Sequence, residues 1–269
     1  MGAEELARVV SGAGFSCVQL APTKAIAGID SVDDVTDSHL ETIQAAFSRK
    51  NVEITVFGCY VEPSLEDKEE RLKNVANFQK GLAQAKRVGA SLVGTETTGL
   101  DINAPDSVRE EAFQRLKDSV LRMVETAEKE DMIMGIEPVA EHTLNTPALA
   151  RRLLDEVGSN KLKIIFDPVN LILPHTIANQ NEIFKEVFEL LGEEIVALHV
   201  KDIVIEGNEK VWRNIGTGVV SYGFIFEWLS QKKPDMRLLR EGVNMDSYKD
   251  DHQAIALMAK MAHVMRGDN

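Results

Sequence analysis

The chain has 269 residues, of which 43 are acidic and 30 basic, so its formal net charge is −13 at pH 7. This excess of negative charge opposes binding to nucleic-acid phosphates and favours a small-molecule partner. No apolar run approaches the roughly 20 residues that cross a bilayer, and the acidic N-terminus lacks the basic region of a signal peptide. With only two cysteines, Cys17 and Cys59, a disulfide framework is not expected. We therefore expect a cytoplasmic protein that does not bind a membrane.

Short β-rich runs alternate with helical patterns along the chain. The first run is preceded by a helical pattern at 4–11. The β-rich runs lie at 17–21, 53–59, 91–96, 132–137, 162–167, 194–200 and 237–241. The helical patterns that follow them lie at about 38–50, 67–88, 107–130, 147–157, 181–192, 222–231 and 248–265. Successive β-rich runs begin roughly 30–40 residues apart, which is the length of one strand with its crossover helix.

This alternation predicts a parallel sheet with helices outside it, in a single domain over residues 1–269. Successive units at one spacing favour a (β/α)₈ TIM barrel over an open, doubly wound sheet. Because a helical pattern precedes the first β-rich run, the expected barrel lacks its first strand at the N-terminus. The alternative is that this strand comes from residues that the pattern does not identify.

Four successive β-rich runs reach a side chain that can bind a metal or transfer a proton. "MIMGIEP" reaches Glu137, "LKIIFDP" reaches Asp167, "IVALHVKD" reaches His199, and "MRLLREG" reaches Glu241. In a parallel barrel, catalytic groups project from the C-terminal ends of the strands. Neighbouring strands lie about 4.8 Å apart, so these groups can converge on one point. Three converging carboxylates would repel one another without a cation, so the sequence predicts a site for Mn²⁺, Mg²⁺, Co²⁺ or Zn²⁺.

Each of these residues also has a commoner structural explanation. Asp167 followed by Pro168 is a typical start of a helix, in which the aspartate caps the first turn. His199 alone would more often be a hydrogen-bonded, partly buried histidine, and Glu241 could pair with Arg240. One such residue stands on each of four consecutive units, and this favours a shared metal site over four separate structural explanations.

The segments "GIEPVAEHTLNTP", "IIFDPVNLI", "ALHVKD", "IGTGVVSYGFIFEWL" and "LLREGV" follow one another in this order. Together they resemble the xylose isomerase-like TIM-barrel superfamily, and within it the sugar phosphate isomerase/epimerase group, over about residues 5–265. The resemblance implies that Glu137, Asp167, His199 and Glu241 bind one divalent metal ion, with manganese favoured. It also implies that Glu137 and Glu241 act as acid and base, one on each face of the sugar.

The activity implied by the resemblance is that of an isomerase in carbohydrate metabolism. A metal-dependent sugar or sugar phosphate isomerase or epimerase would transfer a proton through an enediolate that the metal stabilises. Its partner would be a small-molecule carbohydrate, and a homo-oligomer is left open. An inosose-type dehydratase is the near alternative, because it needs the same metal and base but expels a hydroxyl group. A sugar-binding barrel without catalysis is a further alternative.

DNA repair by an AP endonuclease-like enzyme is disfavoured. That branch of the superfamily uses histidines at the third and fourth strand ends to build a three-zinc cluster. This sequence has Cys59 or Tyr60 and Glu96 at those places. The acidic net charge also opposes a nucleic-acid substrate.

Four further residues are candidates for binding the substrate. His142 follows Glu137 in a loop, and its alternative is an exposed loop histidine. Lys201 shares the side-chain phase of His199, and its alternatives are a solvated lysine or an ion pair with Asp202. Asn170 stands where many members of the family carry a histidine, and Glu96 could line the site or support it from behind. The glycine-rich "IGTG" at 215–218 is a weak phosphate-binding signal that a loop turn explains equally well.

Overall fold

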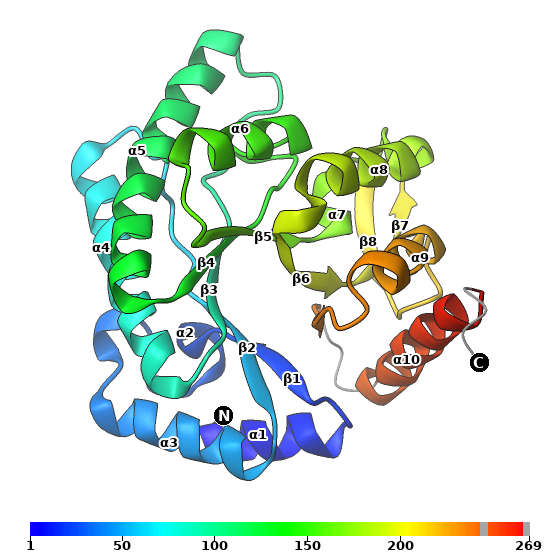
Figure 1. Ribbon diagram of the computed structural model, residues 1–269, viewed down its shortest axis with the longest axis horizontal. Coiled ribbons are helices and arrows are strands. Elements are labelled where there is room, and N and C mark those ends of the chain that lie inside the picture. The colour runs from blue at the N-terminus through cyan, green and yellow to red at the C-terminus, as the bar shows by residue number, and fades with distance from the viewer. Residues whose placement is uncertain (243–246, 266–269) are drawn as a thin grey trace.

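The structure is a computed structural model, in which residues 1–242 and 247–265 are described. Seven parallel strands form one curled sheet in the order β1-β2-β3-β4-β5-β6-β9, with helices around its outside (Figure 1). The strands of this sheet are β1 (Cys17–Leu20), β2 (Glu53–Gly58), β3 (Leu92–Thr95), β4 (Ile133–Ile136), β5 (Leu162–Phe166), β6 (Ile195–Val200) and β9 (Leu238–Arg240). All seven predicted strands are present.

The predicted helices are also present, together with short helices that the sequence did not predict. The long helices are α1 (Ala3–Gly12), α3 (Asp37–Arg49), α4 (Lys68–Val88), α5 (Asp106–Glu130), α6 (Pro147–Val157), α8 (Gln180–Leu191), α9 (Tyr222–Lys232) and α10 (Tyr248–Met265). The short ones are α2 (Pro22–Ala25), α7 (Pro168–Leu171) and the 3₁₀ helices η1 (Val32–Asp34), η2 (Ile177–Asn179) and η3 (Gly192–Glu194).

Helix α4 illustrates how the helices are specified by the sequence. Its Val75, Phe78, Leu82 and Ala85 recur at three- or four-residue steps, and all four are buried against the sheet. The helix ends at Gly89, whose φ of 75° is a left-handed conformation that glycine adopts without strain. These four residues therefore mark the face of α4 that packs on the barrel.

The interior of the barrel is filled by a separate, smaller apolar cluster. It consists of Val56, Leu92, Ile165, Ala197 and Leu239, which come from five different strands. Two glycines on neighbouring strands make room for Ile165. A Cβ atom at Gly94 would lie 2.7 Å from Ile165 Cδ1, and one at Gly135 would lie 2.9 Å from the same atom. The barrel is thus a packed core and not a pore.

The sheet is a nearly closed barrel that lacks one strand, as the sequence predicted. Its edge strands are β1 and β9, which form no ladder with each other. At the N-terminal end of the sheet, Arg237 Nε, just before β9, forms an ion pair at 2.9 Å with Glu53 Oε2, at the start of β2. Towards the C-terminal ends of the strands, a cavity of about 390 Å³ opens between the two edges. α1 and α10 flank this open side of the barrel (Figure 1).

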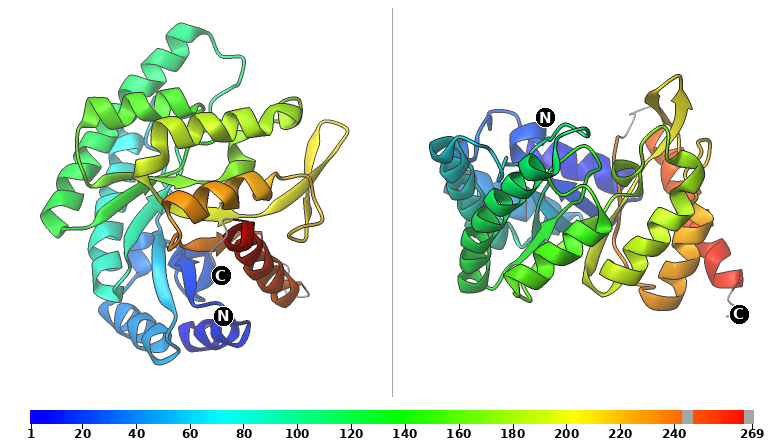
Figure 2. Two further views of the ribbon diagram at one scale, coloured as in Figure 1. Left: turned by 45° about the vertical axis from the view of Figure 1, so that its right-hand side comes forward. Right: turned by 90° about the horizontal axis from the view of Figure 1, so that it is seen from above.

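A two-stranded antiparallel hairpin, which the sequence did not predict, follows β6. It is formed by β7 (Asp202–Glu206) and β8 (Glu209–Arg213), and it projects from the barrel (Figure 2). Gly207 has a φ of 63° in the turn between the two strands. Among the described helices, none has the length and apolar character needed to cross a bilayer.

Candidate functional site

Three of the predicted site residues converge at the C-terminal end of the barrel. Glu137 follows β4, Asp167 follows β5, and His199 lies in β6; their exposed fractions are 2%, 0% and 2%. His199 Nδ1 lies 3.2 Å from Glu137 Oε2 and 3.4 Å from Asp167 Oδ2. Ligand atoms that each lie about 2.0–2.2 Å from one ion are separated from one another by about 3.0–3.5 Å. The spacing of these three residues therefore fits a divalent metal ion.

A buried atom without a hydrogen-bond partner supports the same fit. His199 Nδ1 makes no hydrogen bond, although it is surrounded by carboxylates. A buried polar atom of this kind normally has a partner. A metal ion bound between the imidazole and the carboxylates would supply one, because neutral imidazole and carboxylate oxygens are ligands of Mn²⁺, Mg²⁺ and Zn²⁺.

Asp167 both caps a helix and faces the site. Its Oδ1 accepts hydrogen bonds from the backbone N–H groups of Val169, at 2.9 Å, and Asn170, at 3.1 Å, at the start of α7. Its Oδ2 is turned to His199. The helix-cap explanation of Asp167-Pro168 and the site explanation therefore hold together, because each uses a different oxygen of the carboxylate.

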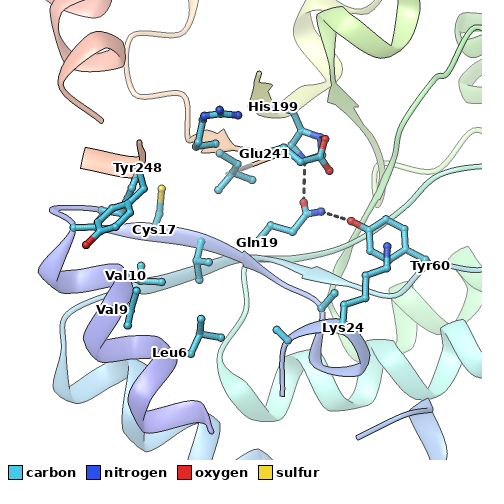
Figure 3. Close-up of a pocket in the computed structure, with 18 residues that line it drawn as sticks. Leu6, Val9, Val10, Cys17, Gln19, Lys24, Tyr60, His199, Glu241 and Tyr248 are labelled. Atoms are coloured by element: carbon cyan, nitrogen blue, oxygen red, sulfur yellow. Dashed lines mark hydrogen bonds and ion pairs between the residues drawn. The ribbon is translucent and has the colours of Figure 1, made fainter. Parts of the chain in front are cut away.

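Gln19, at the end of β1, orients the imidazole of His199 from its other side. The Gln19 Oε1 atom lies 2.9 Å from His199 Nε2, and Gln19 Nε2 donates to the Tyr60 hydroxyl at 2.6 Å (Figure 3). When Nε2 carries the proton and donates it to Gln19, Nδ1 is left to face the carboxylates. Such partners of a metal-ligating histidine fix its tautomer and ring orientation. Gln19 was not among the predicted site residues, because its only signal is a polar residue in the apolar run "CVQLA".

Asn170 contacts a carboxylate of the site. Its Nδ2 donates to Glu137 Oε1 at 2.5 Å, while Glu137 Oε2 faces His199. Burial raises the pKa of the Glu137 carboxyl, and this effect outweighs the opposing influence of His199. Glu137 is thus held in one orientation by Asn170 and is more basic than an exposed glutamate.

Lys201 joins Asp167 to Glu241, the fourth residue of the predicted metal site. Lys201 Nζ lies 2.6 Å from Asp167 Oδ2 and 2.5 Å from Glu241 Oε2. The Glu241 side chain is 34% exposed, and its Oε2 lies 3.9 Å from His199 Nδ1. The alternative ion pairs considered for these two residues are not formed: Lys201 does not pair with Asp202, and Glu241 does not pair with Arg240. Arg240 Nε pairs instead with Asp251, at 2.9 Å.

The charged groups of the site lower the pKa of Asp167 and raise that of His199. Burial acts against the charged form of Asp167, but Lys201 and then His199 hold the pKa of its carboxyl below the ordinary value. Burial also acts against the charged form of His199, but Glu137 and Asp167 raise its pKa well above the ordinary value. Without a metal ion, the two carboxylates therefore favour the protonated form of His199. An arriving metal ion has to displace that proton.

The remaining sequence candidates lie nearby or serve the fold. Glu96 Oε2 and His142 Nδ1 face each other at 3.9 Å, and both side chains are partly exposed. The glycine-rich turn at 215–218 surrounds Asp202, whose Oδ2 accepts from the N–H groups of Gly216, at 3.0 Å, and Gly218, at 2.9 Å. A Cβ atom at Gly218 would lie 2.1 Å from Asp202 Oδ1, so this position requires glycine. The turn is thus occupied by a carboxylate of the chain itself.

Residues 7–260 match the family of xylose isomerase-like TIM barrels, and the chain belongs to that family. Comparison with curated proteins found no match. Among solved structures, the chain is similar to YcjR, a 3-keto-D-glucoside 4-epimerase from E. coli. The TM-score is 0.75 at 16% identity, with 96% of this chain and 94% of that chain covered.

Two further solved structures show the same fold. One is AsbF from Bacillus anthracis, a probable 3-DHS dehydratase, with a TM-score of 0.74 at 18% identity over 95% of this chain and 94% of that one. The other is a xylose isomerase-like TIM barrel protein from Mycobacterium smegmatis in complex with magnesium. Its TM-score is 0.71 at 16% identity, over 97% of this chain and 88% of that one. At these identities the similarity establishes the fold alone.

Proposed function

We propose that the protein is a divalent-metal-dependent isomerase or epimerase that acts on a sugar, a sugar phosphate or a related ketone. The observation that carries this proposal is the buried convergence of Glu137, Asp167 and His199 at three successive strand ends. The family supports it, because structures of similar fold include a sugar epimerase and a magnesium complex. We favour Mn²⁺ as the ion. The net charge of −13 favours a carbohydrate over a nucleic acid as the substrate.

The bound ion would polarise the substrate carbonyl and offset the negative charge that develops when the neighbouring carbon loses its proton. We assign the proton transfer to two carboxylates, those of Glu137 and Glu241. Burial raises the pKa of Glu137, which makes this carboxylate a stronger base than an exposed glutamate. Glu241 faces the cavity that opens between β1 and β9. If one carboxylate takes the proton and the other returns one to the opposite face, the carbon is epimerised.

The test is a screen of ketoses and inososes in D₂O with Mn²⁺, followed by NMR. We expect deuterium on the carbon next to the carbonyl of the substrate and accumulation of its epimer or isomer. Glu137→Gln should reduce turnover by about 10²- to 10⁴-fold, the usual contribution of a positioned acid or base. Glu189→Gln, an exposed change on α8, is the matched control and should leave turnover unchanged.

The outcomes separate the alternatives. Full turnover by Glu137→Gln would show that Glu137 is not a proton-transfer group. Release of water with an unsaturated or dione product would assign the site to a dehydratase, the activity given for the similar AsbF structure. Absence of both exchange and Mn²⁺ binding would reject a metal-dependent enzyme.

A further inference from the structure

The β7–β8 hairpin carries an exposed tryptophan to the edge of the candidate site. Trp212, on β8, is 53% exposed. The centroid of its indole ring lies 5.4 Å from Nζ of Lys201, the ammonium group that contacts two carboxylates of the site. A Cβ atom at Gly242, the residue after Glu241, would lie 3.3 Å from Trp212 Cε3, so the indole also packs closely against the chain at that point. The hairpin thus holds one large aromatic ring beside the proposed metal site.

A second cavity, with a volume of about 670 Å³, borders this tryptophan. Apart from the indole ring, the side chains that the argument uses are polar. The cavity is lined by Trp212, Glu141, Asn170, His175, Glu209 and Lys210, among others. Asn170 also donates to Glu137 Oε1, so the cavity reaches the immediate surroundings of the proposed metal site. A cavity of this size suits a ligand that is larger than one monosaccharide.

An aromatic ring among amide, carboxylate and ammonium groups matches the chemistry of a sugar ring. A pyranose has a patch of C–H groups on its face and hydroxyl groups around its edge. The face of an indole carries the negative part of the ring quadrupole and therefore attracts C–H groups, while the polar side chains offer donors and acceptors to the hydroxyl groups. A purely apolar ligand would bury those polar groups without partners. An anionic group would meet the carboxylates of Glu141 and Glu209.

We propose that this cavity is a subsite for a second sugar ring, with Trp212 as the surface on which that ring stacks. The substrate is then a ketose or related ketone that carries a glycosyl group. Its carbonyl lies at the metal ion and its second ring lies against the indole. This inference rests on the proposed function and narrows the substrate class from sugars in general to glycosylated ones. Trp212 determines specificity and takes no part in proton transfer.

The experiment measures sugar binding to the full-length, Mn²⁺-loaded protein by calorimetry and by tryptophan fluorescence. The probes are D-fructose and the disaccharides turanose, lactulose and isomaltulose, which carry a glycosyl group on O3, O4 or O6 of the same ketose. At least one disaccharide should bind about 10-fold more tightly than D-fructose, because the second ring adds stacking and hydrogen bonds. The chain has two tryptophans, and Trp228 is stacked on Phe188 with ring centroids 4.2 Å apart. In Trp228→Phe the emission reports Trp212 alone, and the disaccharide should change it.

Variants of the tryptophan locate the second ring. Trp212→Leu should weaken binding of that disaccharide by about 3- to 10-fold, so that most of its advantage over D-fructose is lost. Trp212→Phe keeps a smaller ring and should retain part of the advantage, and the matched control Trp228→Phe should retain all of it. If none of the three disaccharides binds more tightly than D-fructose, or if Trp212→Leu weakens D-fructose as much as the disaccharide, the proposal is wrong. The titrations of Trp228→Phe leave the hairpin intact and do not depend on the folding of the Trp212 variants.

The inference and the proposed function fail in different ways. Mn²⁺ binding and deuterium exchange on a monosaccharide ketose, without a preference for any glycosylated ketose, would reject the subsite and leave the metal-dependent function intact. Absence of Mn²⁺ binding by the unchanged protein would reject that function itself.

Discussion

Replacement of Gln19 by leucine tests whether the imidazole of His199 is oriented for metal binding. Gln19 Oε1 lies 2.9 Å from His199 Nε2, and the histidine is 2% exposed. Leucine has a similar size but accepts no hydrogen bond. The buried N–H group would lose its partner, which costs about 1–3 kcal/mol. Loss of such a partner usually weakens metal affinity by about 10- to 100-fold, or about 1.4–2.7 kcal/mol.

The assay is calorimetric titration with Mn²⁺, and two variants serve as controls. Gln19→Glu keeps an oxygen acceptor for His199 and should retain the affinity within about 3-fold, because carboxylate–histidine–metal arrangements are common. Tyr60→Phe removes the hydroxyl that accepts from Gln19 at 2.6 Å, and it should have an intermediate effect. If Gln19→Leu binds Mn²⁺ as tightly as the unchanged protein, the imidazole is not oriented through Nε2 and this reasoning is refuted.

Mn²⁺ affinity should rise with pH, because the pKa values of His199 and Glu137 are raised in the metal-free protein and the ion must displace their protons. The gain should level off above the raised pKa values. Calorimetry in buffers of different ionisation enthalpy should detect proton release, and a pH-independent affinity would contradict it. Asp251→Asn should leave the buried Arg240 without its partner and cost about 3–5 kcal/mol. At about 2.1 cal/mol/K per residue this lowers the Tm by about 5–9 °C, whereas Glu189→Gln, in an exposed pair, should shift it by less than about 2 °C.

The barrel could be predicted because its determinants are local. Each unit combines an apolar run with a helical pattern, and chirality and short connections leave few topologies for such a series. The absence of the first strand was also predictable, since a helical pattern stands before the run at 17–21. The hairpin at 202–213 was missed although a signal exists. "DIVIE" and "EKVWR" flank Gly207-Asn208, a dipeptide typical of two-residue hairpin turns.

The convergence of Glu137, Asp167 and His199 was predictable from topology alone. Residues at the C-terminal ends of adjacent parallel strands must lie near one another. The partners of Lys201 were not predictable in the same way. The sequence indicated that the Lys201 side chain points to the same side as that of His199. That Lys201 pairs with Asp167 and Glu241, and not with the neighbouring Asp202, depends on the lateral order of β5, β6 and β9. Such lateral contacts are not encoded within any one segment.

The position of each group in the sheet matches the role that we assign to it. Glu137, Asp167 and His199 come from β4, β5 and β6, each of which pairs with a strand on both sides. Gln19 and Glu241 come from the ends of β1 and β9, the two edge strands. Residues on doubly paired strands are held by two ladders, and those on edge strands by one. The proposed ion is therefore held by the most constrained strands. The histidine's partner and the second proposed proton-transfer group lie on the two strands that border the open side of the barrel, and both line its cavity.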